Sequence, residues 1–340
     1  MLEESLCKWF AKKIGFNDSS GGIAASGGTL SNLNALIAAR NNAGLGSNPN
    51  SVLLISEDAH SSFIKCIRIM GLDAANLVRI KTDNQGRMDI NNLRKSLNKC
   101  LIENKKIFAI VATLGTTVRG AIDPIKEISE ICKERNIWLH IDGSIGGIFA
   151  LSSIQIEGLN NINQANSITI NPQKIIGITK TSSLLLVANM NTLQKTFSTG
   201  LPYISSKEDI VNRGEIGIQG SRPAEVIKLW LGLRFLGLNG IEDILKSSIK
   251  RKDFFIDHIV KNKFEIYSGP LHIVSFIPKG LTAKDTDFWT HSKVNELMKN
   301  NYMLSRPKFK GKYYLRVVMG NYNTTDSHIE ELLRFLDAYQ

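Results

Sequence analysis

From Trp138 to Gly147 the chain reads WLHIDGSIGG, an apolar run that ends on a carboxylate and passes into glycines. The run predicts a buried strand over residues 137–142 that ends at Asp142. Ligands of α/β proteins bind at the carboxyl ends of parallel strands, so Asp142 is a candidate site residue. Alternation along the strand places His140 on the same face. A metal pair is conceivable, but no third ligand lies nearby in the sequence, and we predict no metal site.

Similar apolar runs recur along the chain, separated by segments of helical period. We predict buried strands at residues 51–56, 107–112, 137–142, 167–170 and 183–187. Amphipathic patterns predict helices before Gly15 and over residues 29–42. This alternation is typical of an α/β protein with a largely parallel sheet. From about Ile218 the pattern changes to long helical stretches, apolar runs at 271–277 and 313–319 and a last helix, which predicts an α+β tail.

Two glycine-rich segments could bind phosphate groups. Residues 115–120 (GTTVRG) have the glycine spacing of a phosphate loop, but Ala121 stands where that loop needs a lysine. No G-x-G-x-x-G follows the first strand, so we expect neither a nucleoside triphosphate nor a dinucleotide. The segment Gly27-Gly28-Thr29 opens a helix, where backbone N–H groups can bind a monophosphate. A plain helix start capped by Thr29 or Ser31 explains the same residues.

Lys174 lies in the loop NPQK (residues 171–174), directly after the strand predicted at 167–170. A lysine between two apolar strands is either an exposed cation or an amine that can form a Schiff base. The loop alone does not choose between them.

Length and composition limit the class of protein. The chain has 340 residues, 43% hydrophobic and 21% charged, which is enough for a large globular core. No apolar stretch approaches the ~20 residues of a membrane span. The net charge of +11 is spread along the chain, so we expect neither nucleic acid nor a membrane as partner. The densest basic run, 306–312, is interpreted as a solvated turn, and four widely spaced cysteines favour the cytoplasm.

Five segments occur together in an order and at separations that are typical of one family. They are GIAASGGTLSNLNALIAAR (22–40), AHSS (59–62), ATLGTTVRGAIDP (112–124), WLHIDGSIGG (138–147) and NPQK (171–174). The chain resembles the group II pyridoxal phosphate-dependent amino-acid decarboxylases, which include the aromatic amino-acid and glutamate decarboxylases. The resemblance covers nearly the whole chain. It implies a type I, aspartate aminotransferase-like fold with a large domain around a mixed seven-stranded sheet (1–235), a small α+β domain (236–340) and a homodimer.

The resemblance also implies pyridoxal 5'-phosphate as cofactor and a role for each matching residue. Lys174 matches the lysine that binds the cofactor as a Schiff base, and Asp142 matches the carboxylate paired with the pyridinium nitrogen. His60 matches the histidine that stacks on the ring. The other matches are to residues that bind the phosphate or lie near the ring's oxygen substituents: Gly28, Thr29, Thr117 and Gln173.

The implied reaction is decarboxylation of an L-amino acid to the amine and carbon dioxide. Tyr203, in the segment Leu201-Pro202-Tyr203, matches a loop tyrosine that reprotonates the substrate carbon; an exposed loop aromatic is the alternative. Two other readings of the chain stay open. It could run another type I pyridoxal phosphate reaction, or it could be a truncated, non-catalytic homologue that binds or dimerises, because family members carry a longer N-terminal segment.

The sequence departs from the family pattern inside two of the motifs. Gln173 stands where the family usually has histidine, so it can donate a hydrogen bond to phosphate but cannot carry charge. Gly143 and Ser144 stand where alanines are usual. Arg222, just before a long predicted helix, either holds a carboxylate or the loop of Tyr203, or is a surface arginine.

Overall fold

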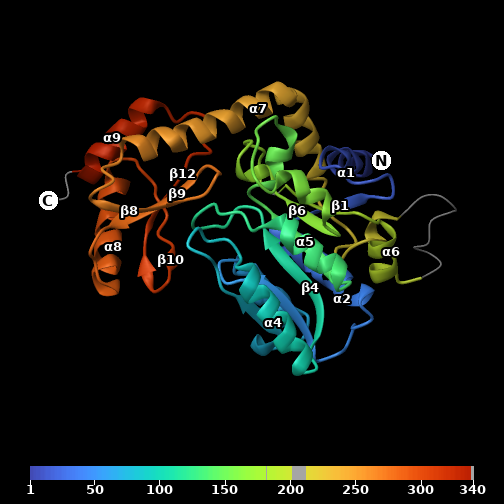
Figure 1. Cartoon of the computed structure of the whole chain (residues 1–340). Helices are drawn as coiled ribbons and strands as arrows, with labels where there is room; N and C mark the ends of the chain where they lie inside the picture. Colours follow the sequence, from blue (N-terminus) through green and yellow to red (C-terminus); the bar gives the residue numbers. More distant parts are fainter. Residues whose placement is uncertain (181, 201–211, 338–340) are drawn as a thin grey trace.

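Figure 1 shows the computed structural model, which describes residues 1–180, 182–200 and 212–337. A larger and a smaller lobe are joined by one long helix, α7 (Val226–His258), which runs across the top of the view. Tyr203 lies outside the described residues.

The larger lobe is built on a seven-stranded sheet. Its strands are β1 (Gly21–Ala25), β2 (Ser51–Ser56), β3 (Leu77–Ile80), β4 (Lys106–Thr113), β5 (Trp138–Gly143), β6 (Ser167–Ile170) and β7 (Ser183–Val187). They lie in the order β1-β7-β6-β5-β4-β2-β3. Strands β2 to β6 are parallel, whereas β7 runs antiparallel to both of its neighbours. The predicted mixed sheet is confirmed.

Two strands of this sheet have no counterpart among the predicted runs. Strand β1 begins with two glycines, Gly21 and Gly22, which are poor strand formers. A Cβ on Gly22 would lie 2.3 Å from the carbonyl oxygen of Leu185 in β7, so the close pairing of these strands requires glycine. Strand β3 is a short edge strand with an incompletely buried pattern, which gives a weak signal in the sequence.

Helices cover both faces of the sheet. They are α1 (Leu2–Lys13), α2 (Gly28–Asn42), α3 (Ser62–Ile69), α4 (Ile90–Ile102), α5 (Ile125–Glu134) and α6 (Asn191–Phe197). Helices α1, α4 and α5 pack on the face that presents Leu54 and Ile110, while α2 and α3 pack on the face of Leu53 and Val111. Strands buried on both faces explain the continuous apolar runs in the sequence.

The smaller lobe has a core of its own. Its sheet contains β8 (Phe264–Ser268), β9 (Ile273–Pro278) and β12 (Leu315–Val318). Its helices are α8 (Ala283–Lys299) and α9 (Asp326–Asp337). A separate hairpin is formed by β10 (Lys308–Phe309) and β11 (Lys312–Tyr313). The core packs Phe255, Phe276 and Leu333 together. This lobe is the predicted α+β part, and its hairpin occupies the basic run 306–312.

Helix α7 belongs to both lobes. Leu229 and Leu245 pack in the core of the larger lobe, and Phe255 packs in that of the smaller one. The helix is interrupted at Gly237, where φ is 61° and ψ is 177°. The domain division between residues 235 and 236 stays a proposal and falls beside this interruption.

All four cysteines are buried and unpaired, and burial raises the pKa of Cys7, Cys66 and Cys132 to about 12. Within the described part of the chain, no helix is both long and apolar enough to cross a membrane.

An ion cluster centred on Glu3 fixes α1 to the edge of the sheet. The Glu3 carboxylate accepts hydrogen bonds from the backbone N–H of Ala24 (2.8 Å), from Arg213 (3.2 Å) and from Arg222 (2.8 and 3.0 Å). Arg222 also donates to the carbonyl oxygens of Arg213 and Gln219. Arg222 is therefore no free surface arginine: it holds a carboxylate of this chain and anchors the segment that leads into α7.

We expect Glu3→Gln to lower the free energy of unfolding at pH 7 by about 2–4 kcal/mol, because Arg213 and Arg222 lose their countercharge in a largely buried place. Burial raises the pKa of Glu3, but the Ala24 N–H and the two arginines outweigh it and hold that pKa below its usual value of 4.5. The stabilisation is therefore present above pH 4.5 and is lost as the pH falls through the folded-state pKa.

Urea unfolding of wild type and Glu3→Gln at pH 7 and pH 4 measures the difference in their free energy of unfolding. The control is Glu4→Gln, which removes an exposed pair with Lys8 one residue along the same helix and should cost less than about 0.5 kcal/mol. Equal effects of the two substitutions at pH 7 would contradict the assignment of Glu3 as the anchor of α1.

Candidate active site

A cavity of about 190 Å³ lies at the carboxyl edge of the parallel strands, where α/β proteins bind ligands. The loops after β2, β4, β5 and β6 and the start of α2 enclose it. Every predicted site residue in the described part of the chain lines this cavity: Gly28, Thr29, His60, Thr117, Asp142, Gln173 and Lys174.

Asp142 ends a chain of buried hydrogen bonds. Its Oδ2 accepts from Asn32 Nδ2 (3.2 Å), and its Oδ1 accepts from the backbone N–H of Ser144 (3.1 Å). Asn32 Oδ1 in turn lies 3.1 Å from His140 Nε2, and His140 Nδ1 lies 2.8 Å from Ser167 Oγ. Trp138 Nε1 donates to the same hydroxyl (2.8 Å).

Every hydrogen bond in this series can be donated in the direction of Asp142. Because the indole N–H of Trp138 can only donate, Ser167 accepts it and can direct its own proton to His140 Nδ1. His140 then carries its proton on Nε2 and donates to Asn32, whose amide N–H donates to Asp142. Burial lowers the pKa of His140 to about 4, which keeps the ring neutral, as this arrangement requires. His140 therefore acts as a link to Asp142.

Asp142 is fully buried yet stays ionised. Burial alone raises the pKa of Asp142, but the charge of Lys174 and the hydrogen bonds from Ser144 outweigh it and hold that pKa below its usual value. An ionised carboxylate at the back of a small cavity is suited to hold a proton on a ring nitrogen.

Lys174 ends the turn Pro172–Lys174, directly after β6, and its side chain is accessible within the open cavity. Burial of the amine lowers the pKa of Lys174, Asp142 raises it, and Arg316 lowers it further. A lowered pKa favours the neutral amine, which is the form that attacks an aldehyde. The Lys174 side chain is thus exposed, and it also lines the cavity that contains the buried Asp142.

His60 comes from the loop between β2 and α3. Its Nδ1 accepts a hydrogen bond from the backbone N–H of Ser62 (3.2 Å), which orients the ring. Burial lowers the pKa of His60, with Lys174 and Lys65 acting in the same direction against Asp142. The ring is therefore neutral at pH 7.

The start of α2 is not capped as one reading of the sequence expected. Its N-cap is Gly27, no side chain caps it, and Ser31 Oγ instead lies 2.8 Å from Ser183 Oγ in β7. The cap reading is therefore wrong, because Ser31 faces the sheet. A Cβ on Gly28 would lie 2.6 Å from Asn171 Nδ2 and 2.9 Å from Ser144 Oγ, so only glycine leaves the backbone accessible here.

Sequence reasoning missed several residues of the cavity. Asn32 sits in the middle of α2, where nothing in the sequence separates a polar site residue from an ordinary helix residue. Ser62 Oγ and Thr113 Oγ1 are buried and have no hydrogen-bond partner within the described residues. Arg316 reaches the site from the smaller lobe and donates from Nη1 to the carbonyl of Thr117 (2.6 Å).

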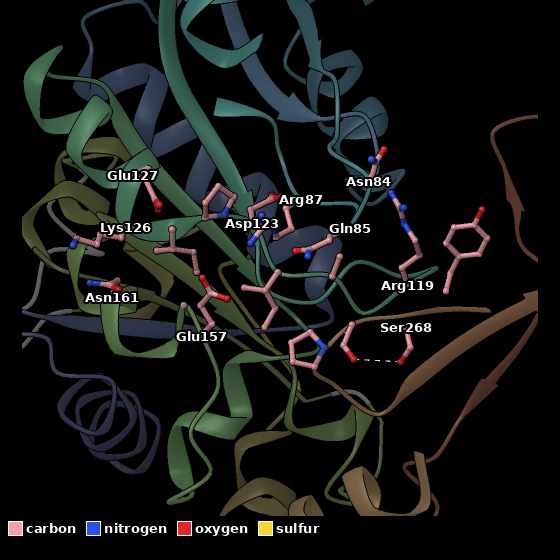
Figure 2. A pocket seen from close by; sticks show the side chains of 18 of the residues that line it. Asn84, Gln85, Arg87, Arg119, Asp123, Lys126, Glu127, Glu157, Asn161 and Ser268 are labelled. Atoms are coloured by element: carbon pink, nitrogen blue, oxygen red, sulfur yellow. Dashed lines mark hydrogen bonds between the residues drawn. The ribbon is translucent and has the colours of Figure 1, made fainter. Parts of the chain in front are cut away.

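A larger cavity of about 630 Å³ lies where the two lobes meet (Figure 2). Figure 2 shows Arg119 and Ser268 at one end and Lys126 and Asn161 at the other, with Asp123 between them. Acidic and basic side chains line it in equal number. It contains none of the predicted site residues.

The site can be compared with known proteins. The sequence model described as the pyridoxal-dependent decarboxylase conserved domain matches residues 1–277. The chain belongs to the pyridoxal-dependent decarboxylase family. The chain is accordingly a pyridoxal phosphate-dependent amino-acid decarboxylase, the class of enzyme that the motifs predicted.

Two curated relatives illustrate the range of this family. An aromatic-L-amino-acid decarboxylase of Bacillus atrophaeus is 31% identical over 99% of this chain and 72% of its own length. The acidic amino acid decarboxylase GADL1 of Mus musculus is 28% identical over 99% of this chain and 66% of its own length. The chain thus spans about two thirds to three quarters of the relatives it matches.

Solved structures share the fold. Mouse CSAD superimposes with a TM-score of 0.91 at 25% identity, over 99% of this chain and 75% of its own. Oryza sativa TDC, solved with PLP and tryptamine, superimposes with a TM-score of 0.91 at 20% identity, over the whole of this chain and 76% of its own length. At this identity the similarity shows the fold alone. The expected type I fold is confirmed.

The cofactor of the family is pyridoxal phosphate, and the residues of the cavity fit it. An accessible amine, an ionised carboxylate and a neutral imidazole meet the needs of an aldehyde, a pyridine nitrogen and a ring face. The uncapped start of α2, open at Gly28, can bind a phosphate group. The unpartnered hydroxyls of Ser62 and Thr113 offer hydrogen bonds to a polar ligand. The described residues hold no group of side chains that could bind a metal ion.

Proposed function

We propose that the chain decarboxylates an L-amino acid to the corresponding amine and carbon dioxide, and that Lys174 is the amine that binds the cofactor aldehyde. The observation that carries the proposal is that Lys174 and Asp142 line the same cavity. Asp142 is buried there and accepts hydrogen bonds from Asn32 and from the Ser144 N–H, and the charge of Lys174 lowers its pKa.

When bound, pyridoxal phosphate supplies an electron sink that takes up the electron pair left as carbon dioxide departs. The Asp142 carboxylate would hold a proton on the ring nitrogen, which would strengthen that sink. His60 would cover one ring face, and the N–H groups of Gly28 and Thr29, with Gln173, would hold the phosphate. Gln173 is oriented for this role because its carbonyl oxygen accepts the N–H of Ser182, which leaves its NH₂ group to donate.

Arg316 is proposed to hold the substrate carboxylate. Its Nη1 donates to Thr117 and its Nε donates to Ser305 Oγ (2.8 Å), so the guanidinium is fixed beside the cavity near Lys174. A carboxylate held there can be oriented so that its bond to the α-carbon lies perpendicular to the ring. Tyr203 remains the proposed donor of the proton that replaces carbon dioxide.

Incubation of the purified chain and pyridoxal phosphate with aromatic and acidic L-amino acids tests the function. We expect amine and carbon dioxide in equal amounts from at least one amino acid. Formation of a keto acid without carbon dioxide would favour the other type I reactions. No turnover of any amino acid by cofactor-loaded protein would favour the non-catalytic homologue.

We also propose a homodimer in the cytoplasm. The first half of α7 carries apolar residues on most of its sides, yet Trp230 is 40%, Leu231 is 54% and Phe235 is 90% exposed. A helix of this kind is usually covered by protein. Light scattering should give twice the monomer mass of 37.7 kDa, and a monomer at micromolar concentration would contradict the proposal. The four reduced, buried cysteines are consistent with the cytoplasm.

A further inference from the structure

The wall of the cofactor cavity that contains Thr117 is held by the smaller lobe. Three successive carbonyl oxygens of this wall accept hydrogen bonds across the lobe boundary. Thr117 accepts from Arg316 in β12 (2.6 Å), Val118 from the hydroxyl of Ser275 in β9, and Arg119 from the backbone N–H of Gly269 after β8 (2.6 Å). We call residues 117–119 with these donors the seam.

The two lobes approach each other closely at the seam. A Cβ on Gly269 would lie 2.2 Å from the carbonyl oxygen of Gly120 and 2.8 Å from the backbone nitrogen of Ala121. Backbone atoms cannot move aside as a flexible side chain can, so any larger residue at Gly269 forces the lobes apart. The seam therefore exists only while the smaller lobe stays in this position.

The side chain of Arg119 extends the seam to the loop of His60. Its Nη2 donates to Asp58 Oδ2, and the two side chains are only 3% and 5% exposed. Asp58 lies two residues before His60, and Arg119 lies two residues after Thr117. The ion pair between Arg119 and Asp58 thus links the loop that carries His60 to the loop that carries Thr117.

The guanidinium of Arg119 is itself held by the smaller lobe. Its Cζ lies 4.4 Å from the ring centroid of Phe309 in β10 and 5.8 Å from that of Tyr267 in β8. Gly86 approaches it closely, since a Cβ there would lie 2.3 Å from Cζ. A buried ion pair contributes stability only when both partners are kept in good geometry. The position of Asp58 therefore depends on contacts made by another lobe.

We propose that Arg119 is a positioning residue that couples docking of the smaller lobe to the geometry of His60 and Thr117. The cofactor cavity reaches its binding geometry when Phe309 and the seam hold Arg119 in place. Arg119 touches neither substrate nor cofactor in this account. The inference rests on the proposed function, because it assigns the coupled cavity to pyridoxal phosphate.

The test changes the smaller lobe and measures the distant cofactor site. Phe309→Leu removes the ring beside Arg119 and should raise the dissociation constant for pyridoxal phosphate about tenfold, equivalent to about 1.4 kcal/mol. It should also reduce the visible circular dichroism of the bound cofactor, which reports its orientation. The control is Phe264→Leu, which removes a buried ring from the core of the same lobe, away from the seam. The control should lower stability but leave cofactor affinity within about twofold of wild type.

A second pair of variants keeps the test decisive if Phe309→Leu does not fold. Gly269→Ala adds one carbon at the seam and should weaken cofactor binding as Phe309→Leu does, whereas Gly46→Ala adds it where no atom lies within 4 Å. The inference is overturned if wild type binds cofactor on Lys174 and both Phe309→Leu and Gly269→Ala bind it with unchanged affinity and dichroism. Wild type that binds no cofactor overturns the proposed function and this inference together.

Discussion

Replacement of Lys174 by alanine is expected to lower amine formation by more than about 10³-fold, the largest effect of any single change in the chain. Lys174 supplies the amine that holds the cofactor aldehyde and releases the product, and no other lysine lines the cavity within the described residues. The folded structure should persist, because the Lys174 side chain is accessible and is not part of the hydrophobic core. Initial rates of carbon dioxide release from the best substrate measure the effect.

Lys180→Ala is the matched control for this substitution. Lys180 follows Lys174 closely in the chain, and its side chain is exposed. Its backbone carbonyl accepts a hydrogen bond from Lys228. We expect a rate within about twofold of wild type. Retention of more than a tenth of the wild-type rate in Lys174→Ala would contradict the role assigned to Lys174.

Asp142→Asn is expected to lower kcat by about 10²–10³-fold while leaving the cofactor bound, the second largest effect. The amide has the size of the carboxylate, and its oxygen can still accept the hydrogen bond from Asn32. It carries no charge, so it cannot hold a proton on the ring nitrogen. The loss should therefore fall on the chemical step rather than on substrate binding, and kcat and kcat/KM should decrease together.

The pH dependence of wild type checks the same assignment. The pKa of Asp142 lies below its usual value of 3.8, so this carboxylate stays ionised between pH 5 and pH 7. A decline in kcat between pH 7 and pH 5 should therefore not disappear in Asp142→Asn, because Asp142 does not cause it. An unchanged kcat in Asp142→Asn would contradict the proposed charge pairing.

The sequence predicts this site well where its residues lie in short motifs beside strands. Asp142 ends one apolar run and Lys174 follows another, and parallel strands bring their carboxyl ends to one edge of the sheet. Spacing alone left Lys174 as an exposed cation or a Schiff-base amine, and only the family resemblance implied a common site. The fold class followed from the same runs. Strand β1 was not predicted, because its pairing with β7 depends on the absence of a side chain at Gly22, and a missing side chain gives no hydrophobic signal.

What the sequence cannot predict are contacts between distant segments. Asn32 connects α2 to β5 through Asp142 and His140, and Arg316 crosses from the smaller lobe to Thr117. Glu3 and Arg222 pair although they lie 219 positions apart in the sequence. Each of these residues has an ordinary local setting, and its role depends on tertiary packing. The cap expected at Thr29 or Ser31 failed for the same reason, because β7 offers Ser31 a partner outside its own helix.

Reduction of the cofactor-loaded protein with borohydride, followed by peptide mapping, tests the central claim most directly. Reduction fixes the cofactor on the amine that holds it, whatever the substrate. The account predicts a single modified peptide that contains residues 171–174 with the label on Lys174, and no label there when Lys174→Ala is treated in the same way. A label on another lysine, or no label in protein that binds the cofactor, would contradict the assignment of this cavity as the active site.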